Sequence, residues 1–219
     1  MSTTQLTFAE ELTLLAHRVT DGKQLIPNNI LNISLTAAEL AELAQLRRVE
    51  LKGTDLAVVD KQPVGDAELD AVLARMTKVG KALPPRRWLI VINPVRKLKH
   101  YQRRLADRGD FRADRRKILG LVPVEDYAQA DSTGAREIRE RLRAVLRGRQ
   151  PDARTVTLLA LAHRSGVTRH LFGAGDDSRI EELIQDDWAG EAVKAYVDKT
   201  TSKTDGSDGS LTILASDGS

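Results

Sequence analysis

Apolar residues recur every three or four positions through most of the chain, and this spacing predicts amphipathic helices. Two of the segments begin with a capping-box sequence, Thr7-x-x-Glu10 and Thr36-x-x-Glu39. In such a box each side chain bonds to the backbone amide of the other residue. We therefore expect one helix to start after Thr7 and a second to start at Thr36 and run to about Leu46.

Further helices are predicted along the rest of the chain. Asp66 is the expected cap of one helix, and Pro84-Pro85 precedes a short one that stops near Asn93-Pro94. A basic helix follows between about Lys97 and Arg108. The remaining predictions are a helix over 138–146, a uniformly apolar and therefore buried helix over 156–162, and one long final helix from 180 to about 196.

Two short stretches have patterns typical of hairpins. Residues 49–59 place short apolar runs on either side of a Gly-containing turn. Residues 118–124, ILGLVPV, are apolar but interrupted by Gly and Pro, which predicts a hairpin or a loop. The predicted fold is mainly α: a central helical bundle surrounded by further helices, with one or two small β-hairpins. We assign residues 1–198 to this domain and the Gly/Ser/Asp-rich residues 199–219 to a disordered tail.

The composition fits one cytoplasmic domain. The chain has 219 residues, of which 41% are hydrophobic, enough for a sizeable core. It has no Cys, which excludes disulfides and thiolate chemistry. The N-terminus lacks the pattern of a signal peptide, and no apolar stretch approaches the roughly 20 residues of a membrane-spanning helix. Any membrane contact is therefore expected to be peripheral.

Charge is distributed unevenly. Between Arg86 and Lys117 there are twelve Lys or Arg residues and three acidic residues, although the net charge of the whole chain is only +3. A basic face of this kind suggests an anionic partner, either lipid headgroups or nucleic acid. Because acidic residues are scarce in this segment, we expect its cations to lack partners within the protein.

Catalytic signatures are missing from the sequence. It contains no zinc-protease motif, nucleophile elbow or phosphate-binding loop. Four histidines, His17, His100, His163 and His170, have no carboxylate at a recognisable ligand spacing. We predict a protein that is not an enzyme and that needs no metal or cofactor.

Two adjacent features are candidates for binding. In the basic helix, cations three or four residues apart share a face, which suits either an anionic surface or an ordinary solvated, salt-bridged face. The apolar run after Arg115-Arg116-Lys117 suits either a buried edge strand or a finger that inserts into a bilayer. Each Lys or Arg near an anionic membrane contributes about 1 kcal/mol, and each buried Leu or Ile about 2 kcal/mol. The candidate headgroup-binding residues are Arg96, Lys97, Lys99, Arg103 and Arg104, and the candidate insertion residues are Ile118, Leu119, Leu121 and Val122.

Five stretches together resemble the Golgi phosphoprotein 3 family, in an order and spacing that cover about residues 5–197. They are LTFAEELTLLAHR near the start, LAELAQLRRVEL at 40–51, VGDAELDAVL at 64–73, LADRGDFRADRRKILGLVPVEDYAQAD at 105–131 and TVTLLALAHRSGV at 155–167. The resemblance implies a mostly helical fold, binding to phosphatidylinositol 4-phosphate, and an apolar β-loop that enters the bilayer. Eukaryotic members serve Golgi retention of glycosyltransferases, and the chain looks most like bacterial members.

The family's headgroup pocket is only partly retained. Where the family has a Trp before the second helix and an Arg near its start, this chain has Pro27 and Thr36. The family's second basic pair falls near Arg96, Lys97 and Lys99. The resemblance therefore implies affinity for anionic phospholipid or phosphoinositide surfaces with reduced headgroup specificity.

Two other kinds of partner are compatible with the basic face. One is an acidic protein, which would make the chain an adaptor or regulatory module that binds protein cargo. The other is nucleic acid, which we do not expect because exposed aromatic residues and a recognisable reader motif are lacking.

Overall fold

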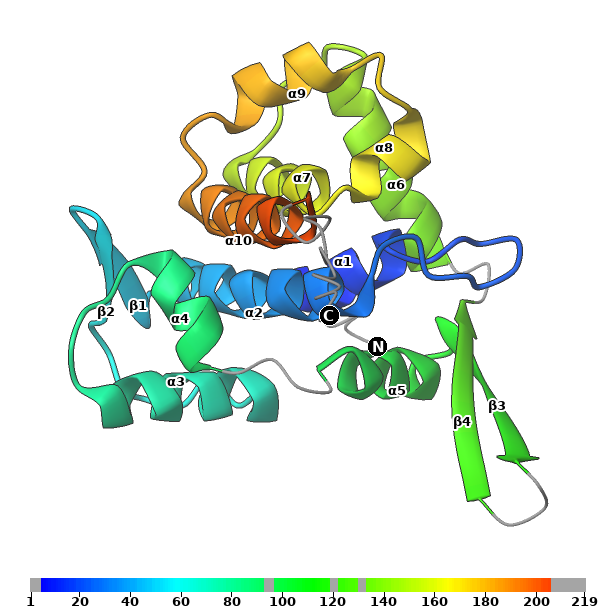
Figure 1. Ribbon diagram of the computed structural model, residues 1–219, viewed down its shortest axis with the longest axis horizontal. Coiled ribbons are helices and arrows are strands. Elements are labelled where there is room, and N and C mark those ends of the chain that lie inside the picture. The colour runs from blue at the N-terminus through cyan, green and yellow to red at the C-terminus, as the bar shows by residue number, and fades with distance from the viewer. Residues whose placement is uncertain (1–4, 93–96, 119–121, 130–132, 206–219) are drawn as a thin grey trace, which may run out of the picture.

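A computed structural model describes residues 5–92, 97–118, 122–129 and 133–205 (Figure 1). This part of the chain is mainly helical, as predicted, with two separate two-stranded sheets. Its elements are, in order, α1 (Phe8–Leu15), α2 (Asn28–Gln45), β1 (Val49–Lys52), β2 (Asp55–Val58), α3 (Ala67–Val79), α4 (Pro85–Val91), α5 (Lys97–Asp107), β3 (Phe111–Ile118), β4 (Val122–Gln129), α6 (Thr133–Leu146), α7 (Ala153–Arg164), α8 (Val167–Phe172), α9 (Asp177–Ile184) and α10 (Trp188–Asp205).

Helix α2 forms the centre of the molecule. Helices α7 and α10 pack on one side of it, and α3 and α5 pack on the other, while α4 contacts both α2 and α10 (Figure 1). Leu31, Leu35, Leu40 and Leu43 of α2 are completely buried between these layers. Burying a leucine side chain contributes about 2 kcal/mol, so this one helix supplies a large part of the core. The predicted central bundle is confirmed.

Local capping signals predicted some helix starts correctly and one wrongly. The capping box at Thr7 is formed, with both reciprocal hydrogen bonds present. The box predicted at Thr36 is wrong, because α2 already begins at Asn28. Thr36 lies inside the helix, where its hydroxyl donates to the Asn32 carbonyl at 3.1 Å. A threonine can satisfy its hydroxyl in this way within a helix, so the motif alone does not fix a helix start.

The C-terminal part of the chain was predicted as one helix but contains two. The side chain of Asp187 accepts a hydrogen bond from the Gly190 amide at 2.8 Å, which starts α10 immediately after the end of α9. The short helix α8 was not predicted. Helix α10 extends to Asp205, beyond residue 198, and residues 206–219 lie outside the described part of the chain.

Both predicted hairpins are present. Strands β1 and β2 pair from Val49↔Val58 to Lys52↔Asp55. Strands β3 and β4 pair from Phe111↔Gln129 to Ile118↔Val122, and their ladder is far longer than the apolar run alone indicates. This second hairpin extends outward from the helical body (Figure 1). None of the helices in the described residues is both long and apolar enough to cross a bilayer.

Candidate functional site

The basic helix α5 is attached to the core along one face. Leu98, Tyr101 and Leu105, which are spaced three and four residues apart, are buried against the helical body. This spacing leaves the charged residues of α5 at the edges of the interface and on the solvent side.

Lys97 is held by a buried carboxylate. Its Nζ atom lies 2.8 Å from Oε1 and 2.7 Å from Oε2 of Glu39, and only 10% of the lysine side chain is exposed. The Tyr101 hydroxyl donates to the same carboxylate at 2.9 Å. Burial raises the pKa of Glu39 to about 7, although Lys97 and Tyr101 partly offset the effect. Helix α5 is thereby joined to α2 through a polar cluster inside the protein.

Arg104 is held by two further carboxylates. Its guanidinium contacts Glu10 of α1 at 3.2 Å and Asp66, the cap of α3. Burial raises the pKa of Asp66, but the hydrogen bonds from Arg104 and from the Leu69 and Glu68 amides outweigh this effect, so that its pKa is lowered overall. The sequence-based expectation that the cations of this segment lack partners is therefore wrong for Lys97 and Arg104. That expectation considered only the acidic residues close to these cations in the sequence. The carboxylates that pair with Lys97 and Arg104 lie in α1, in α2 and at the start of α3.

The other predicted headgroup-binding residues differ in position. Lys99 and Arg103 are exposed on α5, and Lys99 makes no ion pair with any described residue. Arg96 lies outside the described residues. Pro27 lies directly before α2, and Thr36 is buried in the middle of that helix. Of the four predicted cations that the structure describes, Lys97 and Arg104 are therefore bound by carboxylates of the protein, and Lys99 and Arg103 are exposed.

Two of the predicted insertion residues, Ile118 and Val122, lie at the far end of the β3–β4 hairpin. Ile118 is the last residue of β3 and Val122 the first of β4, and they form the final pair of the ladder. Leu119 and Leu121 lie outside the described residues. At the opposite end, Phe111 is buried and contacts His17 edge to face, with 5.1 Å between ring centroids. The hairpin is thus anchored at its base next to α5, and its distal end is carried away from the body (Figure 1).

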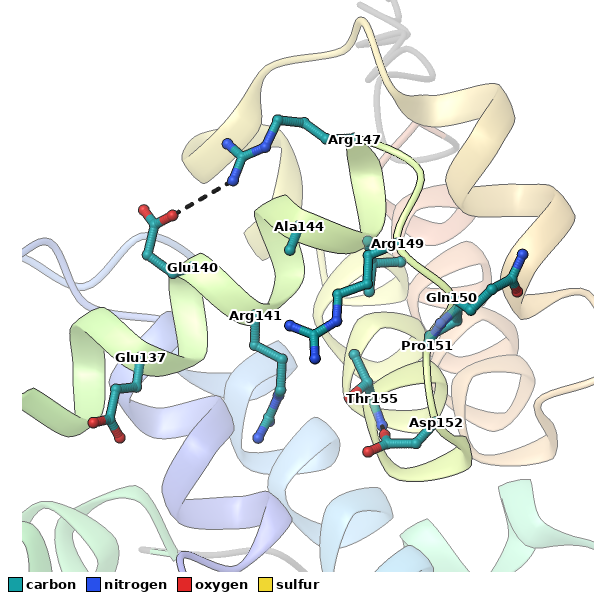
Figure 2. A pocket seen from close by; sticks show the side chains of 11 residues that line it. Glu137, Glu140, Arg141, Ala144, Arg147, Arg149, Gln150, Pro151, Asp152 and Thr155 are labelled. Atoms are coloured by element: carbon teal, nitrogen blue, oxygen red, sulfur yellow. Dashed lines mark hydrogen bonds and ion pairs between the residues drawn. The ribbon is translucent and has the colours of Figure 1, made fainter.

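A polar hollow between α6 and the start of α7 was missed by sequence reasoning. It has a volume of about 690 Å³, and Arg141, Arg147 and Arg149 contribute to its lining (Figure 2). Three acidic residues, Glu137, Glu140 and Asp152, line the same hollow. Arg147 is 3.6 Å from Glu140, and Arg141 is 2.7 Å from Glu11. Because its charges balance, this hollow does not select anions as a basic patch would. In the described part of the chain, no three His, Asp or Glu side chains are grouped as metal ligands.

Comparison with known protein families gives a match that covers most of the chain. The family model described as Golgi phosphoprotein 3 (GPP34) matches residues 8–200, which includes every element from α1 to the greater part of α10. No curated protein matches the chain. The length of this match shows that the chain belongs to the Golgi phosphoprotein 3 family.

Proposed function

We propose that this protein is a non-catalytic domain that docks peripherally on anionic membranes through the β3–β4 hairpin and the exposed face of α5. The observation that carries the proposal is the hairpin itself. It extends beyond the helical body, and its distal residues 115–124 include three cations, five large apolar residues and no acidic residue.

Charge and apolar surface are both required for such docking. Three cations near an anionic surface contribute about 1 kcal/mol each, and two inserted apolar side chains about 2 kcal/mol each. Their sum, about 7 kcal/mol, corresponds to a dissociation constant of the order of 10 µM. Neither contribution alone is sufficient, so binding is reversible and sensitive to salt.

Among anionic lipids, membership of the family favours phosphatidylinositol 4-phosphate as the lipid bound. Pro27 and Thr36 carry no positive charge that could contact the headgroup, and Lys97 already forms an ion pair with Glu39. We therefore propose that selectivity for this lipid over other anionic lipids is modest. Under this proposal, Lys99 and the hairpin cations bind the headgroup.

Vesicle sedimentation tests the proposal. We expect the protein to sediment with vesicles containing phosphatidylserine or phosphatidylinositol 4-phosphate, but not with neutral phosphatidylcholine vesicles. Binding falls as the salt concentration rises, because exposed charges are screened over about 8 Å at physiological ionic strength. Equal sedimentation with neutral vesicles would contradict the proposal.

Variants separate the two contributions. Leu119→Asp is expected to abolish sedimentation. The control Val59→Asp introduces the same charge at an apolar residue that is 45% exposed and directly follows β2, which lies away from the β3–β4 hairpin (Figure 1). Replacing Arg115, Arg116 and Lys117 by Ala is compared with replacing the exposed Lys52, Arg75 and Lys78 by Ala, which removes the same charge elsewhere. Lys97 and Arg104 are unsuitable for this test, because loss of either leaves a buried carboxylate unpaired and destabilises the fold. If the hairpin triple variant sediments as well as its control, the hairpin is not the docking element.

A further inference from the structure

Two adjoining hollows lie between α4 and α10, and the larger one also reaches the β1–β2 hairpin. These elements lie on the part of the molecule remote from the β3–β4 hairpin (Figure 1). One has a volume of about 320 Å³ and the other about 250 Å³. Arg86 and Ala195 line both, so the two hollows adjoin each other. The larger hollow alone falls within the range of small-molecule sites, about 300–1,000 Å³.

The larger hollow is mainly apolar. It is lined by Leu51, Pro84, Pro85, Trp188 and Ala192, among others. Its one acidic residue, Glu191, is 2.8 Å from Arg164 and is therefore neutralised by a neighbour. An apolar body of a few carbon atoms fits this surface.

The smaller hollow is cationic. Arg86, Arg87 and Lys199 line it together with Tyr196, and no acidic residue lines it. None of these three cations makes an ion pair with a described residue. Three cations facing one space without carboxylates attract an oxyanion, and arginine binds carboxylate and phosphate groups with two parallel hydrogen bonds.

Ile90 adds apolar surface to the cationic hollow. It is 58% exposed, more than any other large hydrophobic residue in the described part of the chain. It lies three and four residues after the two arginines on α4, so the three side chains are neighbours on one helix face. Exposed apolar surface next to unpaired cations is suited to a ligand that carries both kinds of group.

We propose that these hollows form a binding site for an anionic amphiphile, with its apolar body between α10 and the β1–β2 hairpin. Its phosphate or carboxylate group is bound by Arg86, Arg87 and Lys199. The site is separate from the hairpin surface and does not depend on the proposed membrane docking. The same chemistry is offered by a free amphiphile and by a lipid within a bilayer.

Binding is measured with decyl phosphate below its critical micelle concentration, by calorimetry and by the fluorescence of Trp188, which lines the apolar hollow. The other tryptophan, Trp88, is completely buried and gives a constant background. We expect decyl phosphate to bind more tightly than decyl glucoside, which lacks the charge, and than inorganic phosphate, which lacks the apolar body. Equal affinity for decyl glucoside and decyl phosphate would overturn the proposal.

Two variants locate the site. Replacing Arg86 and Arg87 by Ala is expected to weaken binding at least about tenfold, the factor that corresponds to loss of one charge-assisted contact. Replacing Arg75 and Lys78 of α3 by Ala is the matched control and leaves the affinity unchanged. Ala195→Trp fills the junction of the two hollows at an exposed position and abolishes binding, with circular dichroism confirming the fold. Unchanged affinity in both site variants would overturn the proposal.

Vesicles that contain phosphatidic acid distinguish the two sources of ligand. If the Arg86/Arg87 variant also sediments less with these vesicles, the site binds a bilayer lipid, and if only decyl phosphate binding falls, it binds a free amphiphile. Leu119→Asp leaves decyl phosphate binding unchanged, so failure of the hairpin proposal and failure of this one give different results.

Discussion

Glu39 links α2 to α5 through a buried polar cluster. It is completely buried in α2, yet it accepts contacts from Lys97 and Tyr101 of α5. Removing a carboxylate from water disfavours its charged form, and this explains why its pKa is raised to about 7. The sequence pattern predicted that Glu39 belongs to a capping box. It did not reveal that Glu39 is the buried partner of Lys97 and Tyr101. Sequence spacing could not reveal the contact, because 58 positions separate Glu39 from Lys97.

The raised pKa predicts how stability depends on pH. Between pH 4.5, the ordinary value for Glu, and about 7, the folded protein retains a proton that the unfolded chain has released. The free energy of unfolding therefore decreases as pH rises through this interval, by up to about 3 kcal/mol from this group. In Glu39→Gln this decrease is absent, so the variant loses less stability than the wild type between pH 5 and about 7. Urea unfolding at several pH values measures the difference, and Glu50→Gln, at an exposed position, is the control. Parallel pH profiles for the wild type and Glu39→Gln would contradict the assignment.

At the scale of elements, the periodic spacing of apolar residues predicted most helices correctly. The capping sequences that mark helix ends were less informative. Asp66 caps α3 through the Glu68 and Leu69 amides, as predicted, but the same side chain also holds Arg104 of α5. The apolar spacing predicts one helix in the C-terminal part of the chain, but the cap formed by Asp187 divides it into α9 and α10. The apolar run at 118–124 located the β3–β4 hairpin, whereas the length of the hairpin was not predicted because residues 111–117 are mostly charged. Tertiary contacts determined these features of the fold, and a local sequence pattern contains no information about such contacts.

The double role of Asp66 gives a second prediction. Asp66→Asn retains an oxygen that can accept from the α3 amides but removes the charge that faces Arg104, whereas Asp66→Ala removes both. We expect Asp66→Ala to lower the free energy of unfolding by about 2 kcal/mol and Asp66→Asn by about half as much. Urea denaturation at neutral pH measures both changes. Equal losses in the two variants would mean that the cap makes no contribution.

The packing of α7 against α10 depends on a glycine. A Cβ atom at Gly190 would lie 2.8 Å from the Cβ of Ala160 and 3.3 Å from its carbonyl carbon, closer than atoms can approach without movement of the helices. Gly190→Ala is therefore expected to destabilise the protein by about 1–3 kcal/mol. Gly175→Ala, where a Cβ meets no atom within 4 Å, is the control for the intrinsic effect of alanine. Thermal unfolding compares them, and an equal midpoint for both variants would show that α7 and α10 are not in close contact.

At the scale of the whole molecule, the β3–β4 hairpin stands apart from the layered helices. Its base packs against α5, and its distal half extends outward from the body (Figure 1). The core is built by helices on both sides of α2, and it does not require the far end of the ladder. Stability and the proposed membrane docking are therefore assigned to different parts of the chain.

A shortened hairpin tests this division. Ala113 and Tyr127 are a pair in the ladder, so residues 114–126 can be replaced by Asn-Gly, a two-residue turn suited to antiparallel strands. We expect the melting temperature to change by no more than about 4 °C, the shift that corresponds to roughly 1 kcal/mol for a domain of this size. Sedimentation with anionic vesicles is lost. A large fall in melting temperature would show that the distal strands support the core.

The ion pairs of Lys97 and Arg104 have a mechanical consequence. Lys97 fixes the first turn of the helix to α2, and Arg104 fixes its last turn to α1 and α3. Because β3 follows α5 after a short turn, a helix fastened at both ends sets the angle of the hairpin to the rest of the protein. With the distal end of the hairpin docked on a bilayer, the tilt of the entire body would be determined by the carboxylates that hold α5. Replacing Glu39, Glu10 or Asp66 would then alter which face of the protein is turned away from the membrane.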